Sequence, residues 1–148
     1  MLKYDISIYL FSQLEEGFFN SKSLTCEFKN NVLNAYKFES SFKEDQPEIT
    51  EKERLNLEKG KTTKNNVQNL FGTPSSKAFF PTTIASGYVP SGTKEIWEYS
   101  YKELSWTMRG YTNKINKSLT KSITIFFDSN GIVIDSRHFK DTLTGTTD

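Results

Sequence analysis

Apolar and polar residues alternate along several stretches of this chain, and this period of two is typical of half-buried β-strands. Residues 3–11 alternate in this way, and so do residues 24–28. The pair Asn30-Asn31 predicts a tight hairpin turn, because Asn tolerates positive φ, and residues 32–40 form the returning strand. The first 42 residues are therefore predicted to be entirely β.

The C-terminal half shows the same alternation and predicts four more strands, over residues 96–101, 104–109, 123–127 and 132–139. The Asn-Gly pair in the turn Asp128-Ser129-Asn130-Gly131 predicts a type I′ hairpin. The Thr-rich residues 143–148 are expected to form a flexible tail.

Between these β-rich halves the pattern predicts two short helices. Thr50 can cap a helix that begins at Glu51 and ends at Gly60. Thr62 or Thr63 then caps a second helix, whose apolar positions Val67, Leu70 and Phe71 lie at i, i+3 and i+4 and face a core. Gly72 is expected to end this helix in the αL conformation, and Pro74 prevents its continuation.

An internal repeat is visible in the sequence. Residues 22–28 (KSLTCEF) align with residues 121–127 (KSITIFF), with four identical positions and one Leu/Ile exchange. An Asn-containing turn and a branched apolar pair follow each copy. The two hairpins either descend from a duplication or share their pattern by chance.

Composition narrows the possible partners. The chain has 148 residues, of which only 35% are hydrophobic and 14% are aromatic, so large rings must supply much of the core. Nineteen basic and eighteen acidic residues leave a net charge of +1, which argues against nucleic acid and anionic membranes as partners. No apolar run is long enough for a transmembrane helix, and the N-terminus does not have the pattern of a signal peptide.

Motifs for catalysis and cofactor binding are weak. Gly60-Lys61-Thr62 resembles the end of a phosphate-binding loop, but Leu55 stands where that motif needs Gly. His138 is the only histidine, and no Gly-x-Ser-x-Gly elbow is present. We therefore expect no enzyme activity, no cofactor and no metal site.

Two surfaces remain as candidates for binding another protein. The loop over residues 75–94 is unusually long and carries Phe79, Phe80, Ile84, Tyr88 and Val89. These side chains either contact a partner or pack the loop against its own domain. The second candidate is the sheet face opposite the rings of Trp97, Tyr99, Tyr101 and Trp106, where five side chains are expected to be exposed: Glu98, Thr107, Arg109, Thr124 and Phe126.

The region from about residue 51 to 140 resembles the SmpA/OmlA (BamE-like) domain family. The resemblance rests on the turn Lys59-Gly60-Lys61-Thr62, the helix residue Val67, the stop Leu70-Phe71-Gly72-Thr73-Pro74 and the strand motif Trp97-Glu98-Tyr99. The closing hairpin over residues 125–133 (IFFDSNGIV) also fits the family. If the repeat is real, the tandem arrangement is similar to that of the β-lactamase inhibitory protein.

This resemblance implies an α+β fold with a helix pair packed on an antiparallel sheet, which the N-terminal strands extend. The expected division is a β-rich segment over residues 1–46, a BamE-like domain over residues 47–142 and the tail over residues 143–148. The implied function is that of a non-enzymatic, envelope-associated protein-binding or assembly module in the periplasm or on the periplasmic face of the outer membrane. The alternative is a periplasmic or secreted inhibitor of an enzyme.

Overall fold

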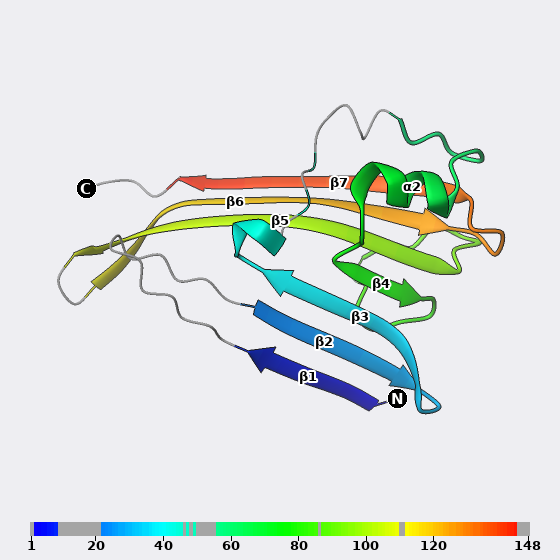
Figure 1. Ribbon diagram of the computed structural model, residues 1–148, viewed down its shortest axis with the longest axis horizontal. Coiled ribbons are helices and arrows are strands. Elements are labelled where there is room, and N and C mark those ends of the chain that lie inside the picture. The colour runs from blue at the N-terminus through cyan, green and yellow to red at the C-terminus, as the bar shows by residue number, and fades with distance from the viewer. Residues whose placement is uncertain are drawn as a thin grey trace.

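The computed structural model describes residues 2–8, 22–45, 47, 49, 56–85, 87–109 and 112–144. Most of them belong to one antiparallel sheet whose seven strands follow one another in chain order (Figure 1). The strands are β1 (Leu2–Ile8), β2 (Lys22–Lys29), β3 (Val32–Ser40), β4 (Ser76–Phe79), β5 (Glu95–Arg109), β6 (Thr112–Phe127) and β7 (Val133–Thr144). A 3-10 turn, η1 (Lys43–Asp45), follows β3.

The helix α2 (Lys64–Phe71) lies across one face of this sheet (Figure 1). Thr63 caps its N-terminus and forms a capping box with Asn66, so two of the otherwise unpaired amides are satisfied. The helix ends at Gly72, whose amide donates a hydrogen bond of 2.8 Å to the carbonyl of Gln68. Local sequence alone therefore explains both ends of the helix.

The core lies between α2 and the strands β5, β6 and β7. Val67 and Phe71 of the helix pack on a layer of buried sheet residues: Trp97, Tyr99, Ile123, Ile125, Phe127 and Val133. The Phe71 and Tyr99 rings have centroids 5.1 Å apart, a favourable tilted contact between aromatic rings. We call this side of the sheet the helix face and the opposite side the far face.

The fold class predicted from the sequence is wrong. The described chain is dominated by the sheet and contains one α-helix of eight residues, rather than a helix pair on a sheet. Residues 51–55, the body of the other predicted helix, lie outside the described residues, and residues 56–60, its predicted end, form turns and irregular backbone. The prediction of one long loop over residues 75–94 is also wrong at its start. Ser76–Phe79 forms the strand β4, which pairs with both β3 and β5.

The turn geometry confirms one prediction and corrects two. Asn30 and Asn31 both have positive φ (52° and 63°), as the predicted two-residue turn requires. The later turn is not type I′, because among Asp128–Gly131 only Gly131 has positive φ, and a β-bulge follows. Gly72 has φ 74° but ψ −148°, so it lies outside the αL region in a conformation nearly confined to Gly.

Candidate functional site

The far face of the sheet is covered by the connection between β4 and β5. We call residues 80–94 the strap, of which residue 86 lies outside the described chain. The strap leaves β4 beside the β2–β3 hairpin, reaches β7 and returns to the start of β5. Its two ends are joined by a hydrogen bond of 2.9 Å from the Phe80 amide to the Lys94 carbonyl.

One end of the strap is fixed by Glu27, a β2 residue whose exposed fraction is 0%. Its Oε2 accepts hydrogen bonds from the Thr83 amide (2.7 Å), the Thr83 hydroxyl (2.6 Å) and the Thr82 hydroxyl (3.2 Å). Its Oε1 accepts a bond of 2.6 Å from Asn34 Nδ2. Four donors therefore surround this carboxylate, which is the arrangement that a buried charge requires.

Asn34 reaches this position because of a β-bulge. Glu27 pairs with Ala35 and Phe28 pairs with Leu33, so Asn34 is the extra residue on β3. Bulges of this kind redirect a side chain. Besides Glu27, the Asn34 amide donates to the carbonyls of Phe79 (3.1 Å) and Pro81 (3.3 Å), so it joins the carboxylate to the strap backbone.

The surroundings of Glu27 keep it ionised. Burial raises the pKa of this carboxyl, but the hydrogen bonds from Thr83, Asn34 and Thr82 favour the charged form and together lower the pKa below its usual value. A buried acceptor with full negative charge forms stronger hydrogen bonds than a neutral one. The strap is therefore held by charge-assisted hydrogen bonds at this end.

Arg137 of β7 fixes the strap farther along. Its guanidinium donates to the Tyr88 carbonyl and lies 5.3 Å from the centroid of the Tyr88 ring. It also lies 5.0 Å from the centroid of the Phe126 ring. Arg137 therefore makes cation-π contacts with a ring of the sheet and with a ring of the strap.

The structure brings most of the predicted binding residues together. Phe79, Phe80 and Tyr88 are exposed at the start of the strap and at its contact with β7, whereas Ile84 and Val89 are half-buried beneath it. Phe126 is only 2% exposed, so the expectation that it is accessible on an open far face is wrong. Arg109 is at the end of β5, away from the strap, and its side chain is not described.

A cavity of about 340 Å³ lies between the strap and the far face. Ile84, Val89, Ile96 and Phe126 supply apolar walls. Glu98, Thr124 and Arg137 supply polar groups on three neighbouring strands. This is close to the lower limit of the ~300–1,000 Å³ typical of small-molecule sites.

Sequence analysis missed the residues that fix the strap. Glu27, Asn34 and Arg137 each lie on predicted strands, where a polar residue at an outward position is read as solvated. Their partners are distant in the sequence: Phe79 is 45 residues from Asn34, and Thr83 is 56 residues from Glu27. The apolar residues in an otherwise polar loop were the only sequence signal that the strap is packed.

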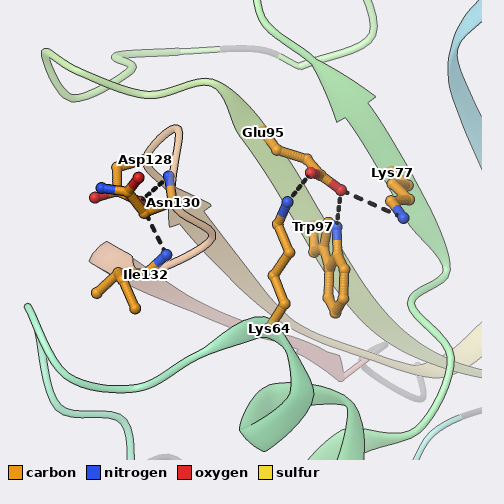
Figure 2. A network of polar contacts seen from close by, with 7 residues as sticks. All are labelled: Lys64, Lys77, Glu95, Trp97, Asp128, Asn130 and Ile132. Carbon is orange, nitrogen blue, oxygen red and sulfur yellow. Dashed lines mark hydrogen bonds and ion pairs between the residues drawn. The ribbon is translucent and has the colours of Figure 1, made fainter.

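A second polar cluster, on the helix face, connects α2 to the sheet (Figure 2). Glu95, which is buried, accepts hydrogen bonds from Lys64 and from Trp97 Nε1 (2.6 Å), and Lys77 lies 3.3 Å away. Burial raises the pKa of Glu95, but the bonds from Lys64 and Trp97 and the two nearby lysines outweigh this effect and lower the pKa. Because the carboxylate is fully engaged, we assign this cluster a structural role.

The Asp128 turn beside it (Figure 2) is also structural. Asp128 Oδ1 accepts bonds from the amides of Asn130 (2.8 Å) and Ile132 (2.9 Å), so the carboxylate closes the turn between β6 and β7. Among the residues that the structure describes, no group of three or more His, Cys, Asp or Glu is placed to hold a metal ion. Within the same residues, no helix is long and apolar enough to cross a membrane.

Comparison of the chain with protein-family models, with curated proteins and with solved structures finds no match. The similarity to the SmpA/OmlA family therefore stays a prediction from short motifs.

Proposed function

We propose that this protein is a non-enzymatic module that binds another protein through the strap and the adjoining end of the sheet. One observation carries the proposal: the strap is fixed at Glu27 and at Arg137 and yet leaves three aromatic rings exposed. Tyr88 is 72% exposed, and Phe79 and Phe80 are each about half exposed. Exposed rings on a fixed backbone are typical of protein interfaces.

Neighbouring residues extend this surface. The turn between β2 and β3 lies at the same end of the sheet as the end of β4 (Figure 1), and Asn34 bonds to the Phe79 carbonyl. Val32 and Leu33, which precede Asn34, are exposed apolar residues. We call Val32, Leu33, Phe79 and Phe80 the tip patch. Side chains that are already ordered lose less entropy on binding, so this surface supports specific recognition.

The cellular place of this activity is inferred from the sequence resemblance. SmpA/OmlA proteins are attached to the outer membrane and support β-barrel assembly or envelope integrity, so we propose an envelope component as the partner and the periplasm as the compartment. The nearly neutral charge of the chain agrees with a protein partner rather than nucleic acid.

A pull-down with matched variants tests this function. The immobilised wild-type chain, a Phe79→Ser/Phe80→Ser double variant and a Leu24→Ser control are incubated with bacterial envelope extract. Leu24 is also an exposed apolar residue, but it shares the helix face, so its substitution should leave the tip patch intact.

We expect an envelope protein to be retained by the wild type and by Leu24→Ser, and to be lost with the double variant. Its affinity for the purified chain should fall at least tenfold with the double variant in calorimetry, because central aromatic contacts dominate binding energy. Equal retention by all three proteins would show that the tip patch is not the binding surface.

An inhibitor of an enzyme is the second candidate, and the doubly fixed strap favours it, because inhibitors bind through loops that are ordered beforehand. The same pull-down separates the two. Retention of a soluble hydrolase, followed by loss of its turnover when the purified chain is added, would favour the inhibitor over the envelope module.

A further inference from the structure

On the far face, a row of residues lies directly opposite one another on successive strands, and its members on β4 to β7 line the cavity beneath the strap. Lys37, Ser76, Glu98, Thr124 and Arg137 occupy this row on β3 to β7. Glu98 is therefore central, with a hydroxyl residue on each side and a cation beyond each hydroxyl. Neighbouring strands are about 4.8 Å apart, so each cation lies on a backbone about 10 Å from that of Glu98.

Both flanking cations are engaged elsewhere. Lys37 Nζ forms an ion pair of 3.0 Å with Glu39, and the Arg137 guanidinium bonds to Tyr88 and makes cation-π contacts with two rings. Ser76 donates its hydroxyl hydrogen bond to the Tyr36 carbonyl. Within the described part of the chain, the carboxylate of Glu98 forms neither a hydrogen bond nor an ion pair.

The environment of Glu98 is unfavourable for an unpaired charge. Apolar side chains from the strap and the sheet, namely Ile84, Val89, Ile96 and Phe126, surround the cavity that it lines. Burial and the nearby Glu39 carboxylate, opposed in part by Lys37, raise the pKa of this carboxyl. This is the reverse of Glu27 and Glu95, whose donors lower their pKa values.

We propose that the cavity binds an ammonium group on a short apolar stem, with the cation at Glu98 and the stem against Ile84, Val89 and Phe126. The ligand supplies the donor and the positive charge that Glu98 lacks, and its stem displaces water from apolar walls. The cavity admits a stem of a few carbon atoms, and the partial exposure of Glu98 and Val89 leaves it in contact with solvent.

This chemistry has two sources, a free alkylamine or a lysine side chain of a bound protein. The inference does not depend on the proposed protein-binding function, because the cavity lies beneath the strap and the tip patch lies at its start. Loss of binding in the double variant at Phe79 and Phe80 would therefore leave amine binding unchanged.

Calorimetry on the full chain at pH 7.5 tests the proposal with three probes of equal length: hexylamine, hexan-1-ol and hexanoate. We expect hexylamine to bind most tightly. Glu98→Gln should weaken hexylamine binding about tenfold or more, the usual loss on removing a charge-assisted hydrogen bond, and should leave hexan-1-ol unaffected. Glu58→Gln removes the same charge from an exposed residue that precedes α2 and should retain hexylamine binding.

Glu98→Gln removes an unpaired carboxylate, so the variant is expected to fold and to melt no lower than the wild type. Equal affinity for hexylamine and hexanoate, or unchanged hexylamine binding by Glu98→Gln, would overturn the proposal. The peptide acetyl-Gly-Lys-Gly-amide distinguishes the two sources. Tighter binding of the peptide than of hexylamine indicates a partner's lysine, and the reverse order indicates a free amine.

Discussion

Replacing Glu27 by glutamine tests whether a buried carboxylate fixes the strap to the sheet. Glutamine keeps the shape of the side chain but changes one oxygen into an NH₂ group. Its remaining oxygen will take the position of Oε2, where three donors from Thr82 and Thr83 converge. The NH₂ group then faces Asn34 Nδ2, which is 2.6 Å from Oε1 in the wild type, so two donors oppose each other.

The cost follows from these contacts. A hydrogen bond to a charged acceptor contributes about 1.5–3 kcal/mol and a neutral one about 0.5–1.5 kcal/mol, so each of the three bonds at Oε2 loses about 1 kcal/mol. Loss of the Asn34 bond adds about 1 kcal/mol more. Removing a buried charge offsets part of this sum. We expect a net loss of about 2–3 kcal/mol, with a melting temperature about 4–12 °C lower if the strap opens together with the global transition.

Hydrogen exchange distinguishes local opening of the strap from global unfolding. The amide of Phe80, which bonds to the Lys94 carbonyl, should exchange about 30- to 150-fold faster in Glu27→Gln, the equivalent of 2–3 kcal/mol. Amides in the β5–β6 ladder should change less. Glu39→Gln is the matched control: it removes the same charge from a surface ion pair, which contributes only about 0.2–1 kcal/mol.

The effect of Glu27→Gln should also depend on pH. The pKa of Glu27 is lowered in the folded protein, so the stabilisation is present above the unfolded-state pKa of about 4.3 and is lost as the pH falls through the folded-state pKa. The difference in unfolding free energy between wild type and variant should therefore be full at pH 7 and shrink below about pH 4. A variant within 0.5 kcal/mol of Glu39→Gln at pH 7 would refute the role of this carboxylate, since surface substitutions fall in that range.

Three further substitutions test the helix face by urea denaturation. Gly72→Val should lower the free energy of unfolding by about 1–3 kcal/mol, because φ 74° with ψ −148° strains any residue that has a Cβ. Gly72→Ala should lower it nearly as much, because no atom lies within 4 Å of the added Cβ and the cost therefore comes from the backbone alone. An unchanged stability of Gly72→Ala would exclude this backbone explanation. Glu95→Gln should cost about 1–3 kcal/mol, less than the 3–5 kcal/mol for breaking a fully buried pair, because both lysine partners are about one-third exposed. Its penalty should disappear in acid, since the pKa of Glu95 is lowered, and a penalty unchanged at pH 3 would contradict an ionised Glu95. Tyr99→Phe should cost about 1 kcal/mol by removing the bond of 3.0 Å from its hydroxyl to the Gly72 carbonyl, and an increase in stability would contradict this.

The parts of the fold that could be predicted are those that local pattern determines. Thr63, Val67 and Phe71 specify a helix with a cap and a buried stripe, and the structure has both. Asn30-Asn31 specifies a two-residue turn, because few other residues accept positive φ at both positions. The alternation at Trp97 and Tyr99 correctly predicts which face of β5 packs under α2.

The failures arise where distant contacts decide. Ser76–Phe79 has too few apolar residues to indicate a strand, and it becomes one because β3 and β5 offer backbone partners on both sides. Phe126 has the alternation of an outward residue, but the strap and Arg137 bury it. The predicted helix pair rested on capping signals, which favour a helix only where packing supports it.

The two contacts that fix the strap lie at aligned positions of the internal repeat. Residues 22–28 lie on β2 and residues 121–127 lie on β6, each the middle strand of three consecutive antiparallel strands, with β4 between the two sets. Glu27 and Phe126 are the aligned sixth positions of the two copies, and both are buried on the far face. Over Glu27 the strap is fixed by hydrogen bonds to the carboxylate, and over Phe126 it is fixed by Arg137, whose guanidinium contacts the Phe126 ring and bonds to Tyr88. The two copies thus provide equivalent places for one connection, and their divergence at this position supplies different chemistry at its two contacts. Exchanging Glu27 and Phe126 would bury a carboxylate beside apolar walls and leave Thr83 without its acceptor. The difference between the two copies at this position, more than their similarity, therefore allows the strap to pack on the far face.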